Sequence, residues 1–434
     1  MASIKEVKGS KKGAYRITVS NGYDMNGKQI KVSTNYTPDP AKTRKQQLKE
    51  AEEYAFEFEK KVKEGRLYNG DKISFADFTE EWLEKEAKVN LEKTTIYCYQ
   101  RNLRNTILPA LGKYKMTKIT PVLLERYFTG LLQEGAKQNG TGAYSMGTVK
   151  RDYTIISSIM RTAVRWNVIE ENPCKRAQLP RERVKDNNVK HFSVEQAKTF
   201  LSILDKPSSV YQEGKKIVNL ERTKRLHIQF VIFFRIALLG GLRRGELIAL
   251  TWDDIDFQHS KIRINKSAGH IDQGQITKST KTVQSNRDIV LPKSEMELLA
   301  RWKTEQKNLM LAVGSKWEGY RGSEFEHNNL FIQTNQNYGK AMNIATPYKK
   351  FVGVINSYNR TVENEEDKLP VIPLHGLRHT FATLQISLGT DVKTTQSMLG
   401  HASIQTTLNT YAHALEDKQR EASNALGTLL NRQA

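Results

Sequence analysis

The sequence contains few cysteines and none of the common motifs that hold a metal ion or a nucleotide. Only two cysteines occur among 434 residues. Cys98 and Cys174 stand far apart, and neither belongs to a CxxC pair or to a Cys/His set spaced for zinc. No nucleotide-binding glycine loop, HExxH, GxSxG or acidic cluster occurs. We therefore expect a reduced intracellular chain that uses no metal and no other cofactor.

Long hydrophobic runs are also missing. The most apolar stretch, "FVIFFRIALLGGL" at 230–242, is too short to cross a bilayer and is interrupted by Arg235. The first residues, "MASIKEVKGSKKG", contain no apolar segment of the kind found in a signal peptide. These features predict a cytoplasmic protein with no membrane partner.

Basic residues dominate what is present. Lysine and arginine number 68 against 47 aspartates and glutamates, which gives a formal charge of +21 and a pI near 9.6. Such a charge favours a polyanionic partner, most often nucleic acid, although a ribosome-bound or anionic-membrane protein would also fit. The 38% share of apolar residues is enough for packed cores, so the chain is not a disordered basic tail.

The pattern of the chain predicts a mainly α fold with small β-sheets (α+β) in three domains. In residues 1–66, "SIKEV", "AYRITVS" and "KQIKVST" alternate apolar and polar residues, with turn residues at Asn21-Gly22 and Asn26-Gly27 between the last two. A long helix follows, with apolar residues at helical spacing at Leu48, Ala51, Ala55, Phe58 and Val62. The basic sheet face has two interpretations: a solvated surface, or a surface that lies on DNA.

Residues 73–174 read as a unit of four helices. Ser74 and Asp77 form a capping-box pattern before the first, and Thr120-Pro121 begins the third. The fourth is expected in "GTVKRDYTIISSIMRTAVRWNVI" and to stop before Asn172-Pro173. Residues 175–192 are basic and poor in apolar side chains, which predicts a linker that follows a phosphate backbone. Residues 193–434 are mostly helical, with strands in "KIRINK" and "SNRDIVLP".

Two stretches gather cationic side chains. In "LHGLRHTFAT", His375, Arg378 and His379 share one helical face, where their charges would repel one another unless an anion is bound. In "GGLRRGELIALTW", two glycines end a helix, and Glu246 follows Arg243 at a spacing that can hold its guanidinium. Taken singly, each residue also fits a structural role, as a surface ion pair, a core side chain or a helix end.

Their order changes this interpretation. "GLRRGEL", "KTVQSNR", "LHGLRHTFAT" and "LGHASIQTTLNTYAH" closely resemble, in this order, the motifs of the tyrosine recombinases, the phage integrase family. The resemblance covers about residues 190–415. It implies an arm-type DNA-binding domain at 1–66, a core-binding helical domain at 73–174, and a catalytic domain with a C-terminal tail at 193–434. It also implies a catalytic set: Arg243, Lys281, His375, Arg378, His401 and the nucleophile Tyr411. The spacing to Arg243 adds Glu246 as its support.

The chemistry of phosphodiester cleavage suits these residue types. Two guanidiniums and a histidine can stabilise the charge that develops on the phosphate, in place of a divalent metal. The resemblance implies that Tyr411 forms a 3′-phosphotyrosyl bond, that His375 accepts its proton, and that Lys281 protonates the departing 5′ oxygen. Lys278 lies close enough in sequence to take the place of Lys281, and the role of His413 is left open.

The resemblance also implies partners: double-stranded DNA at core and arm attachment sites, a homotetramer on that DNA, an excisionase and a DNA-bending protein. Two alternatives use the same fold, namely relaxation of DNA by a type IB topoisomerase and DNA binding by a non-catalytic regulator. The arm-like N-terminus and the complete catalytic set favour an integrase of a phage or an integrative conjugative element. An apolar stripe from Ala414 to Leu430 predicts a short tail helix that docks on its own domain or on a neighbouring protomer.

Overall fold

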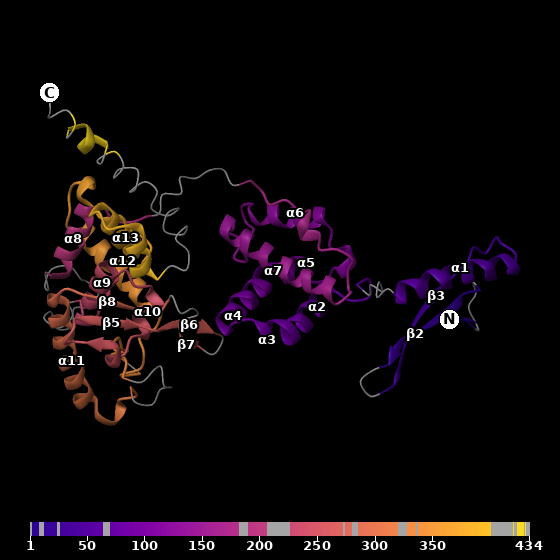
Figure 1. Ribbon diagram of the computed structural model, residues 1–434, viewed down its shortest axis with the longest axis horizontal. Coiled ribbons are helices and arrows are strands. Elements are labelled where there is room, and N and C mark those ends of the chain that lie inside the picture. Colours follow the sequence, from indigo (N-terminus) through magenta and orange to yellow (C-terminus); the bar gives the residue numbers. More distant parts are fainter. Residues whose placement is uncertain are drawn as a thin grey trace. The chain divides into compact units, whose positions relative to one another are not determined.

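The computed structural model shows a mainly helical chain with small sheets, as the sequence predicts (Figure 1). By internal contacts the chain divides into two compact units, residues 1–185 and 186–434, which are described separately. Within the described residues, no helix is both long and apolar enough to cross a membrane. The structure describes residues 2–7, 13–23, 27–63, 70–181, 190–205, 226–271, 274–279, 285–319, 328–335, 337–400, 420, 423–428 and 430.

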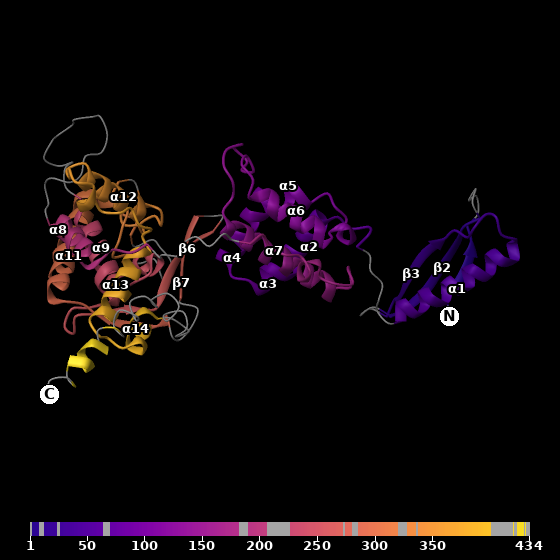
Figure 2. The same cartoon turned by 90° about the horizontal axis from the view of Figure 1, so that it is seen from above.

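The N-terminal segment of the first unit is a three-stranded antiparallel sheet with one helix against it (Figure 2). The strands are β1 (Ser3–Glu6), β2 (Tyr15–Tyr23) and β3 (Gln29–Tyr36), and the helix is α1 (Arg44–Lys63). Alternate residues of the sheet face α1 because side chains alternate across a strand. The core lies between them and contains Ile17, Val19, Ala55, Phe58 and Val62.

One turn prediction in this sheet is wrong. Asn21 and Gly22 do not connect two strands but lie inside β2, where the pairing with β3 shifts register between Ser20 and Tyr23. Gly22 has a φ of 83°, a conformation that glycine adopts at little cost. The pair therefore forms an irregularity that bends the strand.

The next part of the first unit contains the four expected helical stretches. The first two are each interrupted by one π turn, which the sequence did not predict. The stretches are α2 (Phe75–Trp82), the π turn Leu83–Ala87 and α3 (Lys88–Asn90); α4 (Lys93–Asn102), the π turn Leu103–Ile107 and α5 (Leu108–Leu111); α6 (Pro121–Leu131); and α7 (Met146–Arg165). Short 3-10 turns occur at Met116–Lys118 and Pro173–Lys175.

The helix starts agree with the sequence better than one of the ends does. The Ser74 side chain accepts a hydrogen bond from the Asp77 amide in the expected capping box. Thr120 caps α6, and Pro121 lies in the first turn of that helix. The fourth helix, in contrast, ends at Arg165 and does not continue to Ile169. Asn167 adopts a φ of 54°, which asparagine tolerates and which stops the helix.

A buried carboxylate ties three of these helical stretches together. Asp152 in α7 is fully buried and accepts hydrogen bonds from Asn102 Nδ2 at 2.8 Å, Thr106 Oγ1 at 2.7 Å and Tyr127 OH at 2.7 Å. Burial, together with the charge of Asp152, raises the pKa of Tyr127, so this hydroxyl remains a donor. The three donors satisfy a polar group that would be costly to bury alone.

The described ends of the predicted linker are packed. Ala177 and Leu179 lie against the helical core of the first unit. Phe192 is buried in the core of the second unit, and its amide donates to Thr380 Oγ1 at 2.9 Å. Residues 182–189, in the middle of the predicted linker, lie outside the described residues.

In the second unit, helices surround two small antiparallel sheets. One sheet has the order β4-β5-β8, and β6 pairs with β7 in a hairpin. The helices are α8 (Val194–Asp205), α9 (Ile228–Gly240), α10 (Arg244–Ala249), α11 (Lys293–Val313), α12 (Thr346–Asn359), α13 (Gly376–Ser387) and α14 (Val392–Leu399). The strands are β4 (Ile255–Asp256), β5 (Lys261–Ile264), β6 (Lys266–Ile271), β7 (Gly274–Ser279) and β8 (Arg287–Val290), with 3-10 turns at Trp252–Asp254, Gly314–Lys316 and Glu365–Asp367.

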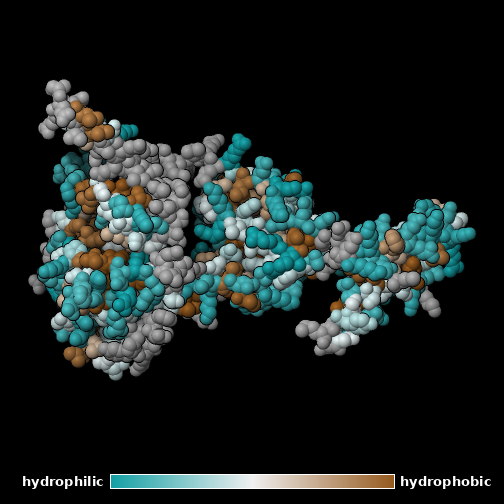
Figure 3. All heavy atoms as spheres, viewed as in Figure 1, coloured by the Kyte–Doolittle hydropathy of each residue, from teal (hydrophilic) through white to brown (hydrophobic). Residues whose placement is uncertain are grey.

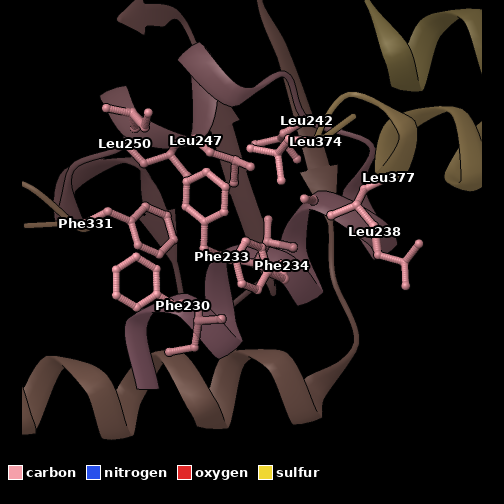
Figure 4. Close-up of a cluster of buried hydrophobic side chains, with 14 of the residues drawn as sticks. Phe230, Phe233, Phe234, Leu238, Leu242, Leu247, Leu250, Phe331, Leu374 and Leu377 are labelled. Atoms are coloured by element: carbon pink, nitrogen blue, oxygen red, sulfur yellow. The ribbon is translucent and has the colours of Figure 1, made fainter. Parts of the chain in front are cut away.

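Helix α9 forms the centre of this unit. It is apolar on nearly all sides, as expected for a helix that is buried all round. It contacts α8, α10, α11, α12 and α13. Figure 4 shows Phe230, Phe233 and Phe234 from this helix packed with Phe331 and with leucines of the following segments. This core fixes the end of α9 and the start of α13. The cationic residues lie just after the first and at the second.

Candidate active site

A close approach between two segments sets the position of Arg243. Helix α9 ends at Gly240, and Gly241 takes a left-handed conformation with a φ of 64°. A Cβ atom on Gly241 would lie 2.4 Å from Cδ1 of Phe381 in α13. Only glycine fits there without displacing that ring. The chain therefore turns tightly against α13 and places Arg243 immediately before α10.

Glu246 holds Arg243 as the three-residue spacing suggests. The Arg243 guanidinium donates through Nη1 to Glu246 Oε1 at 2.7 Å, and its backbone amide donates to Oε2 at 2.9 Å. Burial alone would raise the pKa of Glu246, but hydrogen bonds and positive charge from Arg287, and then from Arg243, hold it below its ordinary value. The carboxylate is therefore ionised and fixes the direction of the Arg243 side chain. Arg244, the adjacent arginine, is exposed.

Arg378 is buried to 1% exposure although it carries a charge. Its guanidinium donates to the Gly241 carbonyl at 2.8 Å and to the Leu399 carbonyl at 2.6 Å. The first contact joins α13 to the turn before Arg243, and the second joins it to the end of α14. Backbone carbonyls accept these hydrogen bonds but carry only partial charge, so they do not neutralise the positive charge of the guanidinium.

Three arginines meet the end of α14 at consecutive residues. Arg287 donates to the Met398 carbonyl at 2.8 Å, Arg378 to Leu399 and Arg243 to Gly400 at 3.2 Å. Carbonyls in the last turn of a helix have no partner within the helix and form the negative end of its dipole, so cations are favourable there. Gly400 closes the helix in a left-handed conformation with a φ of 63°.

His375 lies at the start of α13, next to this cluster. Its ring meets that of His379 edge to face, with 4.8 Å between the ring centroids. Partial burial of its ring, and then the positive charges of Arg378 and Arg243, lower the pKa of His375, although the residue as a whole remains exposed. The ring is therefore neutral near pH 7 and can accept a proton. His379 is half-buried, and burial together with the neighbouring His375 lowers its pKa to about 4.

The β6–β7 hairpin is packed directly against α10. A Cβ atom on Gly245 would lie 2.6 Å from the Ala268 carbonyl, so this glycine permits the contact. At the base of the hairpin the buried Lys266 ammonium lies 2.7 Å from Asp254 Oδ2. Lys278 is opposite Ser267 in the hairpin. The segment that leads toward Lys281 is thus fixed relative to the helix that follows Arg243.

The structure brings Arg243, Glu246, His375 and Arg378 together from two separate stretches of sequence. Lys281, His401 and Tyr411 lie outside the described residues, as does His413. The sequence interpretation gave no role to Arg287, which contacts both Glu246 and the end of α14. Its only sequence signal is its place at the end of "KTVQSNR", where strand β8 begins.

No group of three or more His, Cys, Asp or Glu side chains within the described residues could hold a metal ion. The arrangement instead offers guanidiniums and a neutral imidazole in one place. Such a set can bind a phosphate and stabilise additional negative charge on it.

Comparison with protein families gives the same assignment. Residues 211–418 match the model of the phage integrase family, and residues 74–132 match the model of the phage integrase N-terminal SAM-like domain. The chain belongs to the phage integrase family of tyrosine recombinases. The larger match contains every catalytic candidate, from Arg243 to Tyr411.

Relatives within this family match along nearly the whole chain. The ICEBs1 integrase of Bacillus subtilis is 27% identical over 98% of this chain and 100% of its own length. A protein named tyrosine recombinase XerC-like from Caldanaerobacter subterraneus subsp. tengcongensis is 26% identical over 96% of each chain. Among solved structures, the Tn1549 transposon integrase in complex with transposon right end DNA has a TM-score of 0.61 and 22% identity, covering 82% of this chain and 100% of that one. At that identity the likeness shows the fold.

Proposed function

We propose that this chain is the site-specific recombinase of a mobile element, which integrates and excises the element by cutting and rejoining DNA through a 3′-phosphotyrosyl intermediate. Family membership and the integrase relatives support the recombinase activity. The observation that carries the chemistry is the arginine cluster. Arg243 and Arg378, from separate segments, are both anchored on the segment that leads directly into His401.

In the proposed reaction the Tyr411 hydroxyl attacks the scissile phosphorus. A bond forms between the tyrosine oxygen and phosphorus, and the bond from phosphorus to the 5′ oxygen breaks. The fragment whose 3′ end carries the phosphate stays on the enzyme, and the other fragment leaves with a free 5′ hydroxyl. The phenol proton passes to His375, whose lowered pKa leaves it neutral near pH 7. Lys281 gives a proton to the departing 5′ oxygen, while His401 donates a hydrogen bond to the phosphate.

The two arginines stabilise the transition state in this scheme. Negative charge grows on the non-bridging phosphate oxygens as Tyr411 attacks, and donors held in place beforehand stabilise it without reorganising. Arg243 is fixed by Glu246, and Arg378 by two carbonyls. Rejoining reverses these steps with a different 5′ hydroxyl, and conservation of the bond energy removes any need for ATP.

A cleavage assay with a nicked suicide substrate tests the nucleophile. Tyr411→Phe should bind DNA as the unmodified protein does and form no covalent adduct, because only the attacking oxygen is lost. Tyr348→Phe is the matched control, since Tyr348 is an exposed tyrosine in α12 and should leave adduct formation unchanged. An adduct that survives a denaturing gel with Tyr411→Phe would refute the assignment. Exchange between two attachment sites, scored in the same reactions, separates recombination from simple relaxation.

We infer that residues 1–66 bind arm-type DNA sites through the sheet face opposite α1. The strand pairing places Lys5 next to Arg16, and Lys31 lies on the same face, opposite Ser20. All three basic residues are exposed, and small polar residues of the same face lie beside them: Ser3, Thr18, Ser20, Ser33 and Asn35. A flat polar face with several cations suits a phosphate backbone. Residues 73–174 would bind the core sites.

Charge removal on the two faces of this small domain tests the interpretation. Changing Lys5, Arg16 and Lys31 together to glutamine should weaken arm-site binding and lower its salt dependence by about 0.9 in the log–log slope for each phosphate that these side chains neutralise. The same number of charges removed from the exposed face of α1, at Lys45, Lys49 and Lys60, should change binding much less. Equal effects from both triple variants would show that binding reflects net charge and not the sheet face.

We further infer assembly into a homotetramer on DNA, with an excisionase and a DNA-bending protein as accessory partners, in the bacterial cytoplasm. The described part of the tail supports assembly into a homotetramer. Residues 423–428 are helical, and Leu426 and Leu430 are 56% and 66% exposed. Figure 3 shows hydrophobic residues on the surface of this tail helix. A short helix with exposed leucines is marginal alone and gains stability by docking. We assign the docking surface to a neighbouring protomer.

A further inference from the structure

Arg287 is a buried cation that the proposed chemistry does not use. It begins β8, and its side chain is only 6% exposed. Nη2 donates to Glu246 Oε2 at 2.8 Å, Nη1 to the Ser285 carbonyl at 3.2 Å, and Nε to the Met398 carbonyl at 2.8 Å. The guanidinium thus reaches both the carboxylate that holds Arg243 and the end of α14.

Glu246 is shared between two arginines from different segments. Its Oε1 accepts from Arg243 at 2.7 Å and from Arg287 at 3.3 Å, and its Oε2 accepts from Arg287 and from the Arg243 amide. The carboxylate is 2% exposed, so water does not compete for these bonds. With one negative and two positive charges, the group of three keeps a net charge of +1.

We propose that Arg287 is a positioning residue for strand cleavage: it shares Glu246 with Arg243 and fixes the end of α14, so that Arg243 is held in place without having its charge neutralised. This inference deepens the proposed recombinase function and rests on it. Arg287 acts through Glu246 and the α14 carbonyl, and it does not touch the phosphate in this scheme.

The geometry explains why a second arginine is needed. A buried carboxylate paired with Arg243 alone would form a neutral pair, and the attraction of the guanidinium for phosphate would be offset. Arg287 restores the positive charge. It also fills the space beside Gly400, where a Cβ atom would lie 2.8 Å from Arg287 Nη1. The position before His401 therefore favours glycine, because a side chain there would collide with this guanidinium.

Loss of Arg287 should also alter the pH dependence of cleavage. Arg243 and Arg287 face Glu246 directly, and His375 lies within its electrostatic range. Without Arg287, the hydrogen bonds and the charge that most lower the pKa of Glu246 are lost, so this pKa rises. The protonated carboxyl then holds Arg243 less well as the pH falls. Titration of His375 affects both proteins, so the ratio of their rates isolates the effect of Glu246.

The test measures single-turnover adduct formation on a suicide half-site for the full chain, together with half-site affinity and thermal unfolding. Arg287→Gln should slow adduct formation at least about tenfold, as expected when a donor at the phosphate is misplaced. Half-site affinity should change by less than about threefold, and the rate deficit should widen as the pH is lowered. Arg287→Lys retains the positive charge but not the planar guanidinium that donates to several acceptors at once, and it should recover part of the rate.

A double-variant cycle separates this role from a structural one. In a Glu246→Gln background the Arg287→Gln change should cost much less than in the unmodified chain, because its partner is already neutral. Arg263→Gln is the matched control: Arg263 lies on the neighbouring strand β5 opposite Asp288, has a 70% exposed side chain, and should leave the rate unchanged.

Each outcome decides one point. An Arg287→Gln protein that cleaves at the normal rate, or with a pH-independent deficit that persists in full with Glu246→Gln, overturns the positioning role. If Arg287→Gln does not fold, the same criteria apply to Arg287→Lys. An unmodified protein that forms no adduct overturns the proposed function, and the inference with it, whereas an active unmodified protein with equally active variants overturns the inference alone.

Discussion

Gly241→Ala should destabilise the second unit, because this glycine lies at the contact between the turn before Arg243 and α13. Two costs combine there. The φ of 64° is unfavourable for alanine, and the new Cβ atom would lie 2.4 Å from Cδ1 of the buried Phe381. Gly389 separates the two costs. It also has a positive φ, of 86°, but an added Cβ atom meets nothing within 4 Å.

The magnitudes follow from these two costs. A left-handed conformation costs a non-glycine residue about 1–2 kcal/mol. Forcing an extra carbon into a packed core adds about 1–3 kcal/mol. Gly389→Ala should therefore destabilise by about 1.5 kcal/mol and Gly241→Ala by about 3 kcal/mol. In a unit of this size each kcal/mol shifts the melting temperature by about 2–4 °C, giving about 3–6 °C and about 6–12 °C.

Differential scanning calorimetry of the full chain provides the measurement, following the transition that both variants shift, since the chain has two units that can unfold separately. The Gly241 carbonyl accepts from Arg378, so Gly241→Ala should also slow DNA cleavage, whereas Gly389→Ala should not. Equal melting shifts for the two variants would refute the argument that Phe381 requires glycine at this position.

Three further predictions concern the reaction and the assembly. Arg243→Ala should cost about 3 kcal/mol of transition-state stabilisation, as the loss of an oxyanion donor does. A fall of less than about tenfold in the single-turnover cleavage rate would show that Arg243 does not stabilise the transition state. Because burial, and then the neighbouring arginines, lower the pKa of His375, cleavage should not fall as the pH drops to the ordinary histidine value. Arg243→Ala removes one of these positive charges and should move the inflection of the rate profile upward; an inflection at or above the ordinary value in the unmodified protein would contradict this. Truncation after Glu416 should leave binding to one half-site nearly unchanged but reduce cooperative filling of paired sites, as measured by gel shift, and undiminished cooperativity would mean that the tail docks on its own domain.

Local signals in the sequence predicted much of the fold. The two glycines at 240–241 marked the end of an apolar helix, which is α9, and the pairs Ser74/Asp77 and Thr120/Pro121 marked helix starts that the structure contains. These features depend on residues a few positions apart, which is why the sequence shows them. The spacing of Arg243 and Glu246 is a signal of the same kind, and the two side chains do meet.

Features that depend on distant residues could not be predicted in this way. The partners of Arg287 are 41 and 111 residues away in sequence, at Glu246 and Met398. Nothing near Arg287 distinguishes it from a surface arginine at the edge of a strand. The irregular Asn21-Gly22 pair carries a strong turn signal, yet strand pairing on both sides overrides it. The π turns in the first unit likewise have no local signature that we recognised.

The way the arginines are held bears on how the site can attract phosphate at all. Buried cations are usually paired with carboxylates, which would neutralise a site meant for an anion. Here Arg378 is held by two backbone carbonyls, and Glu246 is divided between Arg243 and Arg287. Two guanidiniums therefore share one carboxylate, and with Arg378 the three arginines and Glu246 together carry a net charge of +2. The carbonyls at the end of α14 add hydrogen bonds to these guanidiniums and carry only partial negative charge. Each cation is fixed in direction, and the cluster as a whole remains positive where the DNA phosphate is proposed to bind.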